Sequence, residues 1–224
     1  MATYVLIHGA WAGGWQWRKV ARLLQAQGHE VFTPTLTGQG ERQHLLTPDV
    51  GLETHITDVQ NLLEFEDLRD VILVGHSYGG VVITGVAEHA PERIAHLVFV
   101  DALIPRDGES VADIMGPVVW AATQARAQTG GEGWRIPAGG EGKDTDHPLK
   151  TFTDRLEVKN PAAVALSRTF IYCTDKPPEA AKGGIARNAE RARAEGWRYY
   201  ELPTGHVPAE TMPRELTDLL LEVV

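Results

Sequence analysis

The residue with the clearest chemical signature in the sequence is Ser77, which lies between Gly75 and Gly79 in a Gly-x-Ser-x-Gly motif. An apolar stretch precedes this motif and a helical sequence follows it, so we predict that the serine lies at a turn from a strand to a helix. The serine backbone is strained at such a turn, and a glycine two residues away on each side avoids collisions. The motif therefore predicts a nucleophile. The alternatives are a tight turn, or a phosphate-binding turn, which would require a Gly-x-Gly-x-x-Gly spacing that this motif lacks.

A serine hydroxyl becomes a good nucleophile at neutral pH only beside a base, which is itself oriented by an acid. Where a nucleophilic serine lies at such a strand-to-helix turn, the acid and then the histidine follow it along the chain, each after the end of a strand. Asp175 ends the stretch FIYCTD, and His206 follows YYELPTG. We therefore predict Asp175 as the acid and His206 as the general base. Asp101, at the end of LVFVD, is the alternative acid, and its other interpretation is a hydrogen-bonding role at the root of the following loop.

The chain contains nine histidines, so the choice of His206 depends on the roles expected for the others. We expect four to be solvated or to cap elements, and two to lie in loops near the mouth of the site. Two more adjoin the predicted catalytic turns, with side chains that point elsewhere. The four expected to be solvated or to cap elements are His29, His55, His89 and His96. The two expected in loops are His44 and His147, and the two beside the catalytic turns are His8 and His76.

Acyl transfer develops negative charge on the carbonyl oxygen, and two preplaced N–H donors stabilise it by about 3 kcal/mol each. We predict that one donor is the backbone N–H of Tyr78, directly after the predicted nucleophile. The second is expected in residues 8–15, HGAWAGGW, with Ala10 as the natural donor. The three glycines of this loop allow a close approach of the backbone, which a plain strand-to-helix connection would not need.

Apolar stretches typical of strands alternate with helical stretches along the chain. Several of the strands are continuously apolar, which is typical of strands buried on both faces of a sheet. This alternation predicts an α/β fold with a mainly parallel, doubly wound sheet of about six strands and helices on both faces. The expected strands span residues 3–9, 29–35, 70–76, 94–102, 168–175 and 197–205, and the expected helices span residues 14–28, 52–66, 79–92 and 212–224.

Residues 105–160 interrupt the alternation because they contain no clear strand. Within them, residues 110–128 are predicted to be helical, with an interruption at Gly116 and Pro117. Insertions of this length between core strands are more often functional than structureless. We therefore predict a lid at residues 105–160, lying over the edge of a core formed by residues 1–104 and 161–224.

The predicted substrate pocket lies between this lid and the edge of the sheet. Large apolar side chains from the first loop and from the lid are candidates to line it, and any one of them could instead belong to the core. The candidates are Trp11, Trp15, Trp120 and Trp134, together with Met115, Val118 and Val119.

The composition limits the choice of partners. The formal net charge of −9 opposes binding to nucleic acid or to an anionic membrane, so neither is expected. The single cysteine, Cys173, excludes an intramolecular disulfide. The N-terminal residues lack a basic region, and no apolar run approaches the roughly 20 residues of a membrane span. We expect a cytoplasmic protein that acts on a small molecule, and the sequence leaves open whether it forms a homodimer.

Four stretches, YVLIHGAWAGGWQW, VILVGHSYGG, CTD and TGH, together resemble the α/β-hydrolase superfamily. Within it they are similar to the subgroup of plant salicylate-methyl-ester esterases, hydroxynitrile lyases and their bacterial relatives. The resemblance covers both ends and the middle of the chain and leaves out the lid. It implies an α/β-hydrolase fold and a serine hydrolase that uses no cofactor and no metal. By position it implies a triad of Ser77, Asp175 and His206, with oxyanion donors at Ala10 and Tyr78.

Two positions distinguish the chain from the lyase branch. The lyases resemble one another in a threonine at the position of Ala10 and in a lysine directly after the catalytic histidine, where this chain has Val207. The expected activity is therefore hydrolysis of a small, partly apolar carboxylic ester through an acyl-enzyme, although thioesters, amides and carbamates suit the same chemistry. The alternatives are a hydroxynitrile-lyase-like activity and a non-catalytic homologue that binds a small molecule.

Overall fold

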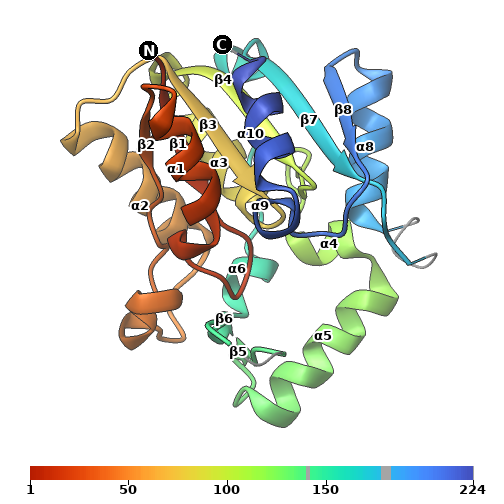
Figure 1. The fold of residues 1–224 in the computed structure, drawn as a ribbon. Helices are drawn as coiled ribbons and strands as arrows, with labels where there is room; N and C mark the ends of the chain where they lie inside the picture. The colour runs from red at the N-terminus through yellow and green to blue at the C-terminus, as the bar shows by residue number, and fades with distance from the viewer. Residues whose placement is uncertain (140–141, 178–182, 224) are drawn as a thin grey trace.

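The computed structural model describes residues 1–139, 142–177 and 183–223. They contain a six-stranded sheet in the order β2-β1-β3-β4-β7-β8 (Figure 1), and every neighbouring pair of its strands runs parallel. The predicted α/β, doubly wound architecture is confirmed. The strands are β1 Thr3–Ile7, β2 Glu30–Phe32, β3 Val71–His76, β4 Ile94–Val100, β7 Ser167–Cys173 and β8 Arg198–Leu202.

The side chains of β1 belong alternately to two hydrophobic cores. Tyr4 and Leu6 pack in one core and Val5 and Ile7 in the other, because successive side chains of a strand point to opposite faces of the sheet. All four are completely buried. This burial on both faces explains why the strand is continuously apolar.

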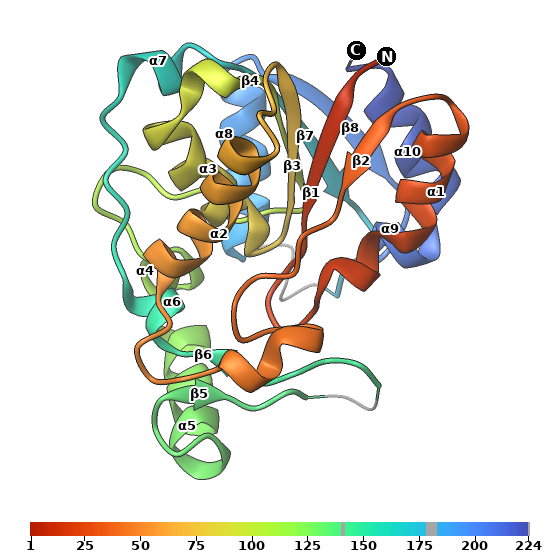
Figure 2. The same cartoon turned by 90° about the vertical axis from the view of Figure 1, so that its left-hand side faces the viewer.

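Helices cover both faces of the sheet. Figure 2 shows α2 and α3 on one side of the sheet and α1 and α10 on the other. The apolar side chains of α1 and α10 complete one core, and those of α2, α3 and α8 complete the other. The helices are α1 Arg18–Ala26, α2 Leu52–Phe65, α3 Gly79–His89, α8 Gly184–Ala194 and α10 Pro213–Leu221, with shorter helices η1 Gly14–Trp17, η2 Gly40–Leu45, η3 Pro91–Arg93 and α9 Pro208–Thr211.

The chain leaves the sheet after β4 and returns at β7, and much of the intervening segment projects beyond the end of the sheet at which the strands terminate (Figure 1). The helical stretch predicted there is present and divides at Gly116, which has a φ of +82°. A short antiparallel pair, β5–β6, was not predicted. The segment contains α4 Val111–Met115, α5 Pro117–Gly130, β5 Arg135–Ile136, β6 His147–Pro148, α6 Lys150–Thr153 and α7 Pro161–Val164.

The described helices are short compared with the thickness of a bilayer. Within residues 1–139, 142–177 and 183–223, none combines the length and the apolar character needed to cross a membrane.

Candidate active site

Ser77 lies in the turn between β3 and α3 and has a left-handed backbone, with a φ of +53°. Its N–H donates to the Val100 carbonyl oxygen at 3.2 Å, and its own carbonyl oxygen accepts from the Leu103 N–H at 3.0 Å. Such a backbone costs a non-glycine residue about 1–3 kcal/mol and persists only where the surroundings enforce it. The turn therefore has the strained geometry that the motif predicts.

Gly75 and Gly79 leave no room for a side chain. A Cβ at Gly75 would lie 2.5 Å from the Gly79 carbonyl oxygen, and a Cβ at Gly79 would lie 2.7 Å from the carbonyl oxygen of Ile7. We expect Gly75→Ala to lower the free energy of unfolding by about 1–3 kcal/mol, measured by urea denaturation, because backbone atoms must shift. Gly205→Ala is the control, since its Cβ would meet no atom closer than the Asp175 carbonyl oxygen at 3.9 Å. Equal losses in both variants would contradict this explanation.

His206 links Ser77 to a buried carboxylate. It lies in the loop between β8 and α9, with its Nε2 2.9 Å from Ser77 Oγ and its Nδ1 2.6 Å from Asp101 Oδ2. An ionised carboxylate can only accept, so Nδ1 carries the proton and Nε2 is free to accept from the serine hydroxyl. The structure thus brings Ser77 and His206 together as predicted, with Asp101 as the third member.

Asp101 follows β4 and is completely buried. Besides His206, its carboxylate accepts from the Cys173 N–H at 3.1 Å and from Lys176 Nζ at 2.5 Å, both at Oδ1. Burial alone would raise the pKa of Asp101, but hydrogen bonds and charges from His206 and Lys176 outweigh burial and lower this pKa below its usual value. Asp101 is therefore ionised at neutral pH and able to stabilise an imidazolium.

Asp175, the acid predicted from the sequence, is not the hydrogen-bond partner of His206 in the structure. The side chain of His206 is hydrogen-bonded to Asp101 instead. The backbone N–H of Asp175 donates to the Thr204 carbonyl oxygen at 3.0 Å, and the residue lines the cavity beside Ser77.

The register of the sheet explains why Asp101, and not Asp175, contacts His206. His76 pairs with Val100 across β3 and β4, so Ser77 and Asp101 are the next residues on two adjacent strands. The strand β7 ends at Cys173, and Asp175 lies two residues further along. Asp101 therefore lies level with Ser77 across the sheet.

Ala10 and Tyr78 both line the cavity beside Ser77. Tyr78 directly precedes α3, so its N–H belongs to the helix N-terminus, where negative charge is stabilised. Within the described parts of the chain, neither the Ala10 N–H nor the Tyr78 N–H donates a hydrogen bond. Both predicted donors thus lie at the site with an N–H that is free to donate to a ligand oxygen.

The insertion holds the loop that contains Ala10 through the next residue, Trp11. Trp11 has a left-handed backbone, with a φ of +65°. Its indole Nε1–H donates to the Ile136 carbonyl oxygen at 3.1 Å, and its own carbonyl oxygen accepts from the Thr145 N–H at 2.8 Å. Its backbone N–H points to His147 Nδ1 at 3.4 Å. The β5–β6 hairpin region therefore fixes the conformation of this loop.

Four histidines around the site are buried. For His55 this differs from the prediction from the sequence, which expected the residue to be solvated or to cap a helix. His55 Nε2 lies 2.8 Å from the Thr37 carbonyl oxygen, so it donates there, and His55 Nδ1 accepts from the Tyr78 hydroxyl at 2.9 Å. Within the described ranges, no three His, Cys, Asp or Glu side chains are grouped as metal ligands. The four are His8, His55, His76 and His147.

We expect the stability of the fold to decrease on mild acidification because of these histidines. Burial lowers the pKa of His8 and His55 to about 4 and that of His76 to about 3. Between the unfolded value of about 6.5 and these values, the unfolded chain binds protons that the folded chain does not, so stability falls as the pH falls. Each histidine contributes up to about 1.4 kcal/mol per pH unit.

Urea denaturation at a series of pH values from about 7 to about 5 measures this dependence. His55→Gln, which removes one of the titrating groups, should make the dependence shallower. A free energy of unfolding that stays constant over this range would contradict the prediction.

An apolar cavity of about 500 Å³ opens beside Ser77 and His206. Of the four predicted tryptophans, Trp11 lines this cavity, and Trp15 lines a second cavity of about 480 Å³ that also reaches Ser77. The apolar lining of the first cavity includes Leu103, Met115, Val119, Phe152 and Ile185.

Trp120 and Trp134 line neither of these two cavities. Trp120 packs against the main hydrophobic core, and the Arg135 guanidinium lies over the ring of Trp134 at 5.2 Å. Among the other candidates, Val118 is 82% exposed.

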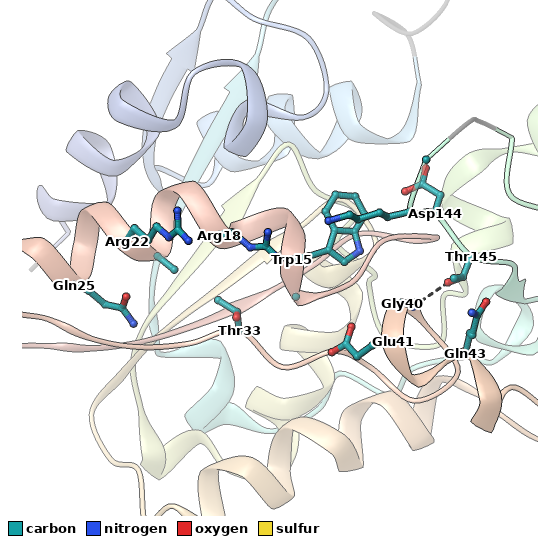
Figure 3. A pocket seen from close by; sticks show the side chains of 14 residues that line it. Trp15, Arg18, Arg22, Gln25, Thr33, Gly40, Glu41, Gln43, Asp144 and Thr145 are labelled. Carbon is teal, nitrogen blue, oxygen red and sulfur yellow. Dashed lines mark hydrogen bonds between the residues drawn. The ribbon is translucent and has the colours of Figure 1, made fainter.

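A polar groove of about 770 Å³ lies beyond the second cavity (Figure 3). It shares Trp15, Lys143 and Asp144 with that cavity, so the two adjoin. Arg18 and Arg22 of α1 lie along the groove. Ser77 thus lies between the apolar cavity and the second cavity, which leads to the polar groove.

Comparison with known proteins places this arrangement among hydrolases. The sequence profile of the alpha/beta hydrolase family matches residues 4–219. Among solved structures, an extracellular alpha/beta-hydrolase from a Paenibacillus species superposes with a TM-score of 0.86 at 26% identity, over 99% of this chain and 98% of that one.

Two curated relatives are named as esterases. The carbendazim hydrolyzing esterase of Nocardioides sp. (strain SG-4G) is 54% identical over 115 residues, which are 51% of this chain and 48% of that protein. Methylesterase 9 of Arabidopsis thaliana is 32% identical over 152 residues, 67% of this chain and 57% of that protein. The matches thus span about half the length of these relatives.

Proposed function

Because the chain belongs to the alpha/beta hydrolase family, we propose that it is a serine hydrolase that cleaves a small carboxylic ester through an acyl-enzyme. The observation that carries this proposal is the hydrogen-bonded series from Ser77 Oγ through His206 to Asp101, at the wall of an apolar cavity. The names of the two esterase relatives support the same reaction type.

In the proposed reaction, Ser77 Oγ forms a bond to the ester carbonyl carbon while His206 Nε2 takes the hydroxyl proton. The Ala10 and Tyr78 N–H groups stabilise the resulting oxyanion, and Asp101 stabilises the imidazolium. The carbon–oxygen bond to the alcohol then breaks as His206 returns the proton to the leaving oxygen. Water repeats the sequence on the acyl-enzyme and releases the acid.

The two cavities suit the two halves of an ester. We place the more apolar half in the cavity lined by Trp11 and Phe152, and the other half toward Trp15 and Lys143. Carbendazim and methyl esters are the first substrates to test, from the names of the relatives. The proposal retains a cytoplasmic protein that acts on a small molecule, and the net charge of −9 opposes binding to nucleic acid.

Labelling with a fluorophosphonate, followed by mass spectrometry of the labelled peptide, tests the proposal. We expect a single adduct at Ser77 in the native protein, and none after heat denaturation, because only the folded site activates the hydroxyl. Absence of labelling would favour a non-catalytic binding protein. Labelling together with turnover of a cyanohydrin but not of p-nitrophenyl acetate would favour the lyase alternative.

A further inference from the structure

A second cation contacts the carboxylate that orients His206. Lys176 Nζ lies 2.5 Å from Asp101 Oδ1, whereas His206 Nδ1 lies 2.6 Å from Asp101 Oδ2. The side chain of Lys176 is only 8% exposed and that of Asp101 is not exposed at all. Asp101 therefore bridges a buried ammonium and the imidazole of His206, whose side chain is 43% exposed at the cavity.

The position of Lys176 ties it to the site rather than to the general surface. It follows β7, and it lines the same apolar cavity as Ser77 and His206. Its Nζ also lies 4.0 Å from the ring centre of Tyr172, an arrangement that favours a cation. The serine, histidine and carboxylate chemistry does not itself require this lysine.

The charge of Lys176 has a direct consequence for the histidine. A lone buried carboxylate would strongly favour the protonated imidazole, in which both nitrogens are donors and Nε2 cannot accept a proton from Ser77. An ammonium on the other oxygen offsets part of that negative charge. The interaction of the Lys176 ammonium with Asp101 is strong because both groups are buried and therefore poorly screened by solvent.

We propose that Lys176 is a positioning residue that balances the charge of Asp101 and thereby keeps His206 neutral, and able to act as a base, in more acidic solution. This inference rests on the proposed function of Ser77, His206 and Asp101. The bond to Lys176 also fixes the rotation of the carboxylate, so that Oδ2 faces the imidazole.

Other titratable groups face the same atoms. His76 lies beside His206, with ring centres 4.8 Å apart, and burial lowers the pKa of His76 to about 3, so it is neutral. Burial also raises the pKa of the Cys173 thiol to about 12, so it is neutral as well. The charged residues that share the two cavities with His206 are Lys143, Asp144, Asp175, Lys176 and Glu210. Of these, only Lys176 is bonded to Asp101 within the described residues.

The test compares three variants at Lys176 by the pH dependence of kcat/KM for a neutral ester. Lys176→Met removes the charge, Lys176→Gln removes the charge but keeps a donor, and Lys176→Arg keeps the charge. We expect the acidic limb of the profile to move to higher pH by about 1 unit in the methionine and glutamine variants. The arginine variant should retain the limb of the original protein.

A second measurement is independent of turnover. Proton NMR detects the hydrogen on His206 Nδ1, and the pH at which its signal titrates should rise in Lys176→Met and Lys176→Gln but not in Lys176→Arg. A lysine that serves only the packing of the loop would lower stability without moving this signal. If the methionine variant does not fold, the glutamine variant decides.

The outcomes separate the two proposals. If activity depends on Ser77 but the acidic limb and the NMR titration are the same in all four proteins, the role of Lys176 is overturned and the proposed function stands. If ester hydrolysis persists in Ser77→Ala, the proposed function itself fails. A shift that arginine causes as strongly as methionine would also overturn the charge explanation.

Discussion

Ser77→Ala is expected to lower kcat/KM for p-nitrophenyl acetate by about 100,000-fold, because the acyl-enzyme cannot form without the hydroxyl. The remaining groups would still bind the ester and stabilise an oxyanion, so a small residual rate above the uncatalysed reaction is expected. Steady-state kinetics at neutral pH, with circular dichroism to verify folding, measures the effect.

The sequence offers a matched control for this variant. It contains only three serines, Ser77, Ser110 and Ser167. Ser110 caps α4 through a hydrogen bond with Asp113, whereas Ser167 is exposed at the start of β7. Ser167→Ala should therefore keep nearly all activity. If Ser77→Ala retained a rate similar to that of this control, the nucleophile would have to be another group.

Asp101→Asn is expected to lower kcat by about 1,000- to 10,000-fold. An asparagine amide can donate to His206 Nδ1, which favours the tautomer with the proton on Nε2. That proton would then face Ser77 Oγ, and the ring could no longer accept from it. Asp175→Asn should change kcat only a few-fold, since the side chain of His206 is bonded to Asp101 and not to Asp175.

Asp101→Asn and Asp175→Asn together decide between the two candidate acids, and the comparison needs two controls. Asp101→Asn leaves Lys176 without its counter-charge, so the loss of activity must be compared in the double variant Asp101→Asn/Lys176→Met. Urea denaturation shows how much of any loss reflects unfolding. A large loss in Asp175→Asn with a small loss in Asp101→Asn would restore Asp175 as the acid.

The sequence was most informative where chemistry depends on local backbone geometry. Ser77 between two glycines is typical of a strand-to-helix turn, so the motif alone predicts that turn. The six strands were predictable because burial on both faces leaves a continuously apolar pattern. Asp101 and Asp175 could not be separated in this way, since each follows a strand and only the register between strands places one of them level with Ser77.

Features that depend on contacts between distant segments were out of reach. His55 lies on an otherwise ordinary amphipathic helix, and its burial follows from its bond to the Tyr78 hydroxyl, 23 positions away. Trp120 and Trp134 were assigned to the pocket because they lie in the insertion, but the direction of each side chain depends on how α5 and the hairpin pack. The contact between Lys176 and Asp101 was not predictable, because nothing in the sequence around Lys176 indicates it.

The anchoring of Trp11 to Ile136 and Thr145 has a consequence for protein engineering. A chimaera that received the insertion of another member of the family would also lose the bonds that keep this tryptophan in its unfavourable backbone conformation. Such grafts should succeed only when the stretch that follows β1 is exchanged with them. The two segments form one transplantable unit, although more than a hundred residues separate them in the chain.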